Sequence, residues 1–447
     1  MKKIGIMMVA LMAMLVCSCS GGAGIEKLLQ SVPESTSAVG VFNLQSLSEK
    51  AGNVEKDGRM DLSAEMKNFI TSMGPTDAKD FQAFFSGESG IELNSAVCYE
   101  YQGEMYMTGY VDDEKQLAEF LTKHGGAKFT ETDGAYVSQK GNAVIRDGRW
   151  WYTSGKMTLQ DAEAFAGLKK EESILDLEYG RKLADSDRDM EFFAVYDKLL
   201  TAGEIPMDKV MQARLLTSTL FKEAKYIAGG VEFKKGKAEA ELEILDINFK
   251  PSQFSIKMGK ISKKQLKAFN GRGDLYLAAA VSEEALDNIA GQLGVLGMKG
   301  ANGNILKSLD GNIVVGMNTD WMPADAKGMG ALIGCRDKDG ARALGQLFSF
   351  LPFGHTAATN VDGSNLTVNL GIPMGRIPDE VISEMSGHAI AMVYDPTAGA
   401  PAFSGWKSIV LTVDNKEAKI EIEAETKDKE KNALPVLLQT LASMKKK

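Results

Sequence analysis

Two stretches of the chain alternate small or branched apolar residues with charged ones. The first runs from Val231 to Glu243 and the second from Leu411 to Glu423, and they align without a gap. Alternation gives a strand one buried and one solvated face, so each stretch predicts two antiparallel strands. We expect the turns at Lys235-Gly236 and at Asn415-Lys416.

Similar elements precede each of these hairpins. An apolar strand ends in Val195-Tyr196-Asp197 before the first hairpin and in Val393-Tyr394-Asp395 before the second. Further upstream, a strand followed by a helix is predicted at Ser37–Phe42 with 44–51, and again at Asp274–Ala279 with 281–293. The order of elements is therefore the same in both parts of the chain.

A strand meander followed by an amphipathic helix also occurs twice. The first meander is 95–111 with a helix at 114–121, and the second is 312–335 with a helix at 338–348. We therefore predict an α+β fold made of two tandem related repeats of antiparallel sheet with packed helices. Repeat one covers 33–255 and repeat two covers 262–447.

Other local patterns add elements to this outline. Helices are predicted at 62–73 and 78–85, and the Asp147-Gly148 pair between apolar runs predicts a hairpin. The chain is expected to close with a helix at 432–444.

The N-terminus has the pattern of a secretion signal. Lys2 and Lys3 precede an apolar run from Ile4 to Val16, and Ser18 is a small residue directly before Cys19. A run this short is typical of a signal peptide and not of a membrane span. We predict a cleaved signal at 1–18, lipid attachment at Cys19 and a lipid-anchored tether at 19–32. After this signal, no segment contains 18 consecutive apolar residues, so no further transmembrane helix is predicted.

Composition and charge limit the function classes. The chain has 447 residues, of which 44% are hydrophobic, and a formal charge of −9. These values are typical of an acidic globular protein. An acidic surface argues against nucleic-acid binding and against electrostatic attraction to anionic lipid. The membrane should therefore be contacted through the N-terminal lipid. Cys98 and Cys335 both lie in apolar strand patterns, which favours two separate core thiols, although export to an oxidising compartment would permit a disulfide.

The sequence offers little material for catalysis or metal binding. Its three histidines, at 124, 355 and 388, do not have zinc-ligand spacing. The segment 185–189 alternates carboxylates as a calcium loop does, but Met190 and Tyr196 stand where an EF-hand needs Gly and Glu. We interpret this segment as a solvated turn, and we nominate no catalytic, cofactor-binding or metal-binding residue.

Trp150 and Trp151 are the candidate ligand contacts. They follow the Asp147-Gly148 turn, and adjacent residues of a strand point to opposite faces of a sheet. If one face packs on the core, one of the two rings could stack on a sugar, a lipid or a partner, unless a helix covers it.

The repeat pattern and the opening at 32–39, Val-Pro-Glu-Ser-Thr-Ser-Ala-Val, resemble a family of bacterial lipoproteins of unknown function. These are envelope proteins of anaerobic diderm bacteria, built from two related α+β halves, and no catalytic signature accompanies the resemblance. In relatives displayed outside the cell, an acidic run tends to follow the lipid cysteine. The segment 20–24, Ser-Gly-Gly-Ala-Gly, departs from that pattern, which favours a body facing the periplasm over surface display.

These features favour a non-catalytic, lipid-anchored envelope protein that binds an envelope protein, a glycan or another ligand through its two-repeat surface. One alternative is a glycan-active hydrolase that uses two dispersed carboxylates. Another is an interaction module that acts as an inhibitor or a scaffold, which would show a broad apolar patch.

Overall fold

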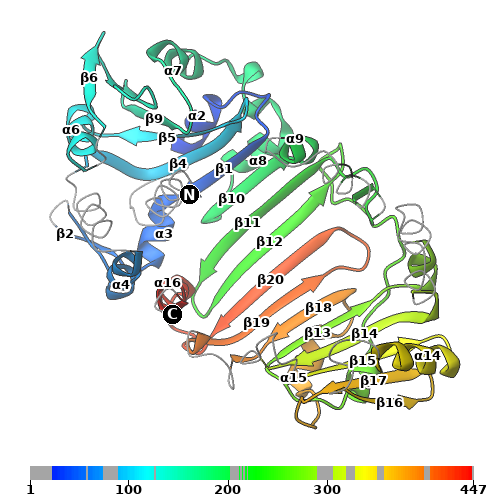
Figure 1. The fold of residues 1–447 in the computed structure, drawn as a ribbon. Coiled ribbons are helices and arrows are strands. Elements are labelled where there is room, and N and C mark those ends of the chain that lie inside the picture. The colour runs from blue at the N-terminus through cyan, green and yellow to red at the C-terminus, as the bar shows by residue number, and fades with distance from the viewer. Residues whose placement is uncertain are drawn as a thin grey trace. The chain divides into compact units, whose positions relative to one another are not determined.

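The computed structural model is shown in Figure 1. It describes residues 23–56, 59–73, 89–124, 127–201, 211, 214, 217–218, 220–288, 306–318, 328–349, 357–396 and 403–444. The predicted signal peptide at 1–18, Cys19 and the predicted helix at 78–85 lie outside these residues. In the described part of the chain, no helix is both long enough and apolar enough to span a bilayer.

The chain forms two compact units whose boundaries differ from those of the predicted repeats. Unit 1 comprises Met1–Val210, Lys225–Ala240 and Asp428–Lys447, and unit 2 comprises Met211–Ala224 and Glu241–Lys427. Strand β12 (Lys237–Leu245) crosses the sequence boundary between them. The sequence of unit 1 is therefore interrupted by that of unit 2.

Unit 1 contains an antiparallel sheet in the order β6-β7-β8-β9-β5-β4-β1-β10-β11. Its strands are β1 (Ala38–Asn43), β4 (Ile91–Tyr101), β5 (Glu104–Val111), β6 (Phe129–Thr132), β7 (Ala135–Ser138), β8 (Ala143–Arg146), β9 (Arg149–Thr153), β10 (Met190–Val195) and β11 (Tyr226–Lys234). A separate hairpin consists of β2 (Val54–Lys56) and β3 (Arg59–Asp61).

The helices of unit 1 pack on this sheet and on one another. They are α2 (Ala23–Gln30), α3 (Leu44–Lys50), α4 (Ala64–Met73), α6 (Glu114–His124), α7 (Leu159–Ala166), α8 (Glu178–Ala184), α9 (Tyr196–Thr201) and α16 (Ala433–Met444), with the 3-10 turns η3 (Lys170–Glu172) and η4 (Ile174–Asp176). In α2, Leu28 and Leu29 are completely buried. Because α2 packs on β4, the chain is part of the fold from Ala23 onward. The predicted tether at 19–32 therefore overlaps the folded unit, and only the residues before Ala23 are left to connect it to the membrane.

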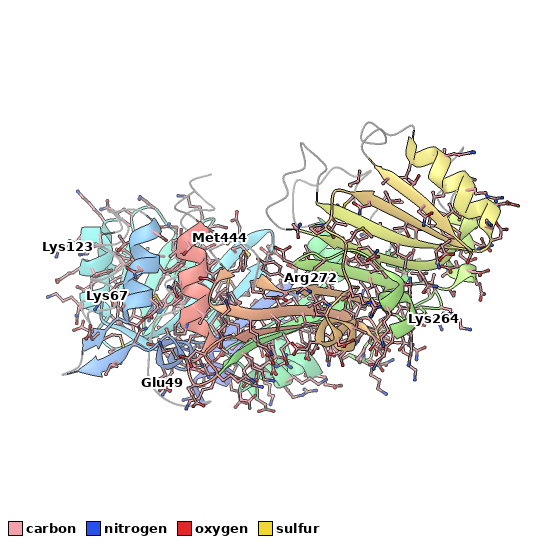
Figure 2. The ribbon with its side chains drawn as sticks, turned by 90° about the horizontal axis from the view of Figure 1, so that it is seen from below. Glu49, Lys67, Lys123, Lys264, Arg272 and Met444 are labelled. Atoms are coloured by element: carbon pink, nitrogen blue, oxygen red, sulfur yellow. The ribbon has the colours of Figure 1, made fainter. Side chains whose placement is uncertain are left out.

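The C-terminal helix α16 completes unit 1. It packs against α4, and both helices are labelled in Figure 1, whereas in Figure 2 Met444 and Lys67 mark them. The segment that leads into α16 is held by main-chain and side-chain hydrogen bonds: Gly236 N donates to Lys431 O at 2.8 Å, and Asn432 Nδ2 donates to Phe233 O at 3.3 Å. The helix was predicted at 432–444 as part of repeat two, and these contacts explain why it belongs to unit 1.

Unit 2 contains an antiparallel sheet in the order β16-β17-β15-β14-β13-β18-β19-β20. Its strands are β13 (Leu275–Ala280), β14 (Leu309–Met317), β15 (Met329–Cys335), β16 (Ala358–Asp362), β17 (Asn365–Leu370), β18 (Ile390–Tyr394), β19 (Trp406–Val413) and β20 (Lys419–Thr426). Among the described residues, its helices include α11 (Lys263–Ala268), α14 (Lys338–Ser349) and α15 (Asp379–Met385), and residues 283–288 are helical as well.

The core of unit 2 lies between the sheet and helices α11 and α15. Leu266 and Phe269 from the α11 segment and Val381 from α15 pack on strand residues that include Tyr276 and Val393. Helix α14 packs on the other side of the sheet, over β15 and β17, where Leu344 joins a second cluster. Buried residues of β13, β14, β15 and β18 thus line the face of the sheet under α11 and α15.

The strands of the two units follow the same order. β1 lies between β4 and β10 as β13 lies between β14 and β18, and β5 pairs with β4 and β9 as β15 pairs with β14 and β17. The α+β class predicted from the sequence is confirmed. The correspondence concerns strand order and pairing, and the two tandem repeats at 33–255 and 262–447 stay a prediction.

Candidate functional site

An apolar row crosses four neighbouring strands of unit 2. Leu277 of β13 lies opposite Met392 of β18, which lies opposite Leu411 of β19, which in turn lies opposite Ile422 of β20. Residues opposite each other in antiparallel strands share one face of the sheet. With strands about 4.8 Å apart, the row is about 14 Å long. We call these four residues the apolar row.

The apolar row lies on the face opposite the core. Its neighbours along the strands, Ala278, Ala391 and Val410, point the other way and pack in the cluster under α11 and α15. Leu277 is 36% exposed and Ile422 is 37% exposed, which is high for aliphatic residues in the middle of strands. The row thus presents aliphatic carbon to solvent at the centre of a sheet.

Other apolar side chains border the row on the same face. On one side of it, Val315 of β14 packs against the cluster that α14 covers. Along the strands, the row is flanked by Ile409 and Ile420, both half-buried. Helix α14 therefore covers the outer strands, whereas the row itself does not belong to a described core cluster.

Unit 1 has a corresponding apolar face. Phe192 of β10 is 40% exposed and lies between Gly40 of β1 and Gly229 of β11, on the face opposite buried Val39 and Phe193. In the next register position, Phe42, Met190 and Val231 lie side by side across the same strands. Because glycines flank Phe192, this face offers one aromatic side chain and not a continuous aliphatic row.

The two tryptophans predicted as ligand contacts lie on opposite faces of β9, as adjacent strand residues must. Trp151 is only 2% exposed and packs with Val144 and Phe165 beneath α7. Trp150 is half-buried and packs with Leu117 and Ile145 beneath α6. A helix therefore lies over each ring. Trp151 has no surface to offer a ligand in this structure, and a contact through Trp150 stays a prediction.

The turn in front of Trp150 explains how the two rings are positioned. Asp147 and Gly148 have φ values of 53° and 71°, as a two-residue hairpin turn requires, and this hairpin prediction is confirmed. Gly109 on the neighbouring strand β5 leaves room for the indole of Trp150, since a Cβ there would lie 2.9 Å from ring atom Cζ2.

The carboxylate-rich segment 185–189 is a solvated turn only in part. Asp185 and Asp187 are exposed, but Asp189 is completely buried. Its carboxylate accepts hydrogen bonds from Lys50 Nζ at 2.8 Å, from Ser46 Oγ at 2.5 Å and from Phe233 N at 2.6 Å. Asp189 thus joins α3 to β11, and the interpretation of this residue as part of a solvated turn was wrong.

The two cysteines of the folded units are unpaired and buried. Burial raises the pKa of the Cys98 thiol to about 12 and also raises the pKa of Cys335, where Asp310 and Asp337 add to the effect. A thiol with so high a pKa is a poor nucleophile at neutral pH. These residues fill core space, as favoured from the sequence.

The histidines and carboxylates described in the structure do not assemble a metal centre. His124 ends α6 and stacks on Phe120 at 4.6 Å between ring centroids, and His388 precedes β18, where its carbonyl accepts a hydrogen bond from Ile261 N. His355 lies outside the described residues. Among those residues there is no group of three or more His, Cys, Asp or Glu side chains that could hold a metal ion.

The apolar row was not nominated from the sequence, although a signal for it is present. Strands β13 and β18 read Leu-Tyr-Leu-Ala-Ala-Ala and Ile-Ala-Met-Val-Tyr, without polar alternation. A strand that is apolar at every position is normally covered on both faces. In the part of the chain that the structure describes, helices pack on one face of these strands and leave Leu277 exposed on the other, so the continuous apolar pattern marks this second face.

Comparisons with known proteins give a distant likeness in structure alone. No protein-family model matches the chain, and no curated protein does so. Crystal form I of TP0453, an envelope lipoprotein of Treponema pallidum, is similar with a TM-score of 0.30 and 8% identity over 80% of this chain and 97% of that chain. Crystal form IV gives a TM-score of 0.31 and 7% identity over 48% of this chain and 79% of that chain.

Proposed function

We propose that this chain is a non-catalytic, lipid-anchored protein of the cell envelope, and that unit 2 binds the acyl chain of a lipid on its apolar row. The observation that carries the proposal is the exposure of Leu277 and Ile422, at the two ends of a row in which every side chain is aliphatic. Polar specificity is absent from the row, so its ligand must be recognised by apolar area.

The chemistry of the row favours an acyl chain over the other expected ligands. A glycan is bound by aromatic stacking and by polar groups, and the row provides neither. The core of a protein–protein interface is enriched in Tyr, Trp, Phe, Met and Arg, and of these residue types the row contains only Met392 beside Leu and Ile. A lipid attached at the predicted Cys19 would also hold the body next to a bilayer, where acyl chains are abundant.

The energy available is modest for each side chain. Complete burial of a Leu or Ile side chain is worth about 1.5–3 kcal/mol, so covering the third that is exposed contributes about 0.5–1 kcal/mol. Binding of a ligand with measurable affinity therefore requires the whole row and its bordering residues Ile409 and Ile420, and it should be sensitive to a polar group anywhere along the row.

A fluorescence titration tests this. The chain from Ser20 onward would be titrated with a dansyl-labelled fatty acid, and the dissociation constant compared with that of a variant carrying both Leu277→Gln and Ile422→Gln. We expect roughly tenfold or greater loss of affinity, because each buried amide without a partner costs about 1–3 kcal/mol.

Leu347→Gln is the matched control, since Leu347 is 39% exposed in the same unit and belongs to α14, which packs over β15, β16 and β17, outside the four strands of the row. Its affinity should equal that of the unmodified chain. The proposal fails if the unmodified chain does not bind the fatty acid, or if the double variant binds it as tightly while urea unfolding shows both proteins to be folded. Capture of a protein by a photocrosslinker placed at Met392, with no effect of fatty acid on the yield, would assign the row to a protein partner instead.

A further inference from the structure

One segment of this acidic protein is strongly basic. Between positions 257 and 272 the chain carries five lysines and one arginine and no acidic residue, although its formal charge as a whole is −9. All six side chains are exposed, and none of them forms an ion pair with a residue in the described part of the chain. We call them the basic surface: Lys257, Lys260, Lys263, Lys264, Lys267 and Arg272.

Half of the basic surface belongs to helix α11 of unit 2. Leu266 and Phe269 of the α11 segment point into the core, which leaves Lys263, Lys264 and Lys267 on the outside of the helix. Gly259 N donates to Ala280 O at the end of β13, whereas Asp274, which follows Arg272 and Gly273, directly precedes its start. The cations therefore extend along the whole length of β13, and Figure 2 labels Lys264 and Arg272 in this stretch.

An exposed apolar side chain lies within this surface. Met374 is 77% exposed, the highest value among the large hydrophobic residues described. Its loop is attached to the basic segment, because Arg272 N donates to Pro373 O at 2.8 Å and Gly375 N donates to Asn270 Oδ1 at 3.2 Å. Arg376, also exposed, adds a cation beside Met374.

The neighbouring helix carries carboxylates. α15 packs beside α11 and carries exposed Asp379, Glu380 and Glu384. The two helices thus form an acidic part at α15 and a cationic part at α11.

We infer that the basic surface binds the anionic headgroups of a phospholipid bilayer, with Met374 entering the interface. The basic surface lacks aromatic side chains and bidentate arginine contacts that would select one particular protein sequence. Exposed lysines suit a planar and chemically uniform anionic surface better. A single exposed Met at the level of the cations can be buried among lipid headgroups, as interfacial apolar residues are. This inference does not depend on acyl-chain binding by the apolar row, which lies on the opposite face of the sheet.

Vesicle sedimentation tests the inference. The chain from Ser20 onward, which lacks the predicted lipid site, would be mixed with vesicles of phosphatidylcholine alone or with one third phosphatidylglycerol. We expect binding to the anionic vesicles only. It should be lost in about 1 M salt, where the Debye length is about 3 Å. A variant with Lys263→Gln, Lys264→Gln and Lys267→Gln should partition about 100-fold more weakly, since each lysine near an anionic surface contributes about 1 kcal/mol.

The matched control removes three exposed lysines of unit 1, with Lys115→Gln, Lys123→Gln and Lys128→Gln, and should bind as the unmodified chain does. Equal loss in both variants would mean that only net charge matters and would overturn the inference, as would absence of binding to the anionic vesicles. Displacement by inorganic phosphate beyond the effect of chloride at equal ionic strength would also overturn it, because that result indicates a discrete phosphate site. The apolar-row variant Leu277→Gln/Ile422→Gln should keep vesicle binding, which separates the two proposals.

Discussion

Asp189 shows what single residues contribute to this fold and why sequence reasoning misses some of them. Its three hydrogen-bond donors come from positions 46, 50 and 233. Local spacing predicts a turn around Asp189 but carries no information about partners more than 40 residues away. The Asp147-Gly148 turn was predictable because its geometry depends on those two residues alone.

Asp189→Asn should destabilise unit 1 by about 3–5 kcal/mol, because Lys50 loses its counter-charge and the buried hydrogen bonds are weakened. Urea unfolding followed by circular dichroism measures this. Asp187→Asn is the control, since it makes the same chemical change at an exposed position two residues away. Equal stability of the two variants would contradict a structural role for the buried carboxylate.

The two thiols should be unreactive in the folded protein. With the pKa of Cys98 at about 12 and that of Cys335 raised, the thiolate fraction at pH 8 is very small, and burial adds a steric barrier. Ellman's reagent should modify neither residue in the native chain from Ser20 onward and both after denaturation in guanidinium. Rapid modification of either thiol without denaturant would show that its strand is open to solvent.

At the scale of elements, the sequence predicted most strands and helices but not their assignment to compact units. The meanders at β4–β5 and β14–β15 and the helices that follow them are where periodicity places them. Helix α16 was also predicted, but its partner α4 lies more than 300 residues earlier in the chain. Periodicity reports which face of a helix is apolar and not which surface that face will meet.

A chain that ends at Lys427 lacks α16 and should lose stability in unit 1 selectively. Removal of α16 uncovers α4 and the end of β11, against which it packs. Amide hydrogen exchange should become faster in peptides from α4 and β11 and stay slow in peptides from β13 and β18 of unit 2. Uniformly faster exchange in both units, or no change in either, would contradict this assignment of the helix.

At the scale of the whole molecule, the fold class could be read from the sequence, whereas the candidate binding surfaces could not. Alternation of apolar and polar residues along a strand indicates that one of its faces is solvated. A strand such as β13 has no such alternation, and its exposure depends on how far the helices extend over the sheet. In the same way, net charge alone argues against electrostatic contact with lipid, whereas the structure shows that all six cations at 257–272 are exposed.

Cys19→Ala should release the protein from the membrane without unfolding it, because the described fold begins at Ala23. Fractionation of cells that express an epitope-tagged chain, combined with protease treatment of intact and permeabilised cells, measures both attachment and orientation. We expect digestion of the unmodified chain only after permeabilisation, as for a body facing the periplasm. Digestion in intact cells would place the body on the outside, and membrane retention of the Cys19→Ala variant would contradict lipid attachment at this residue.

The interruption of unit 1 by unit 2 determines the order in which the two units can complete their folds. Residues 428–444, which complete unit 1, are synthesised after the whole sequence of unit 2, which ends at Lys427. Unit 1 therefore cannot complete its fold, and the packing surfaces of α4 and β11 stay uncovered, until residues 428–444 have followed the whole of unit 2. A nascent chain that stalls late would contain a finished second unit and an unfinished first one, and chaperones and quality-control proteases would recognise it by that exposed surface.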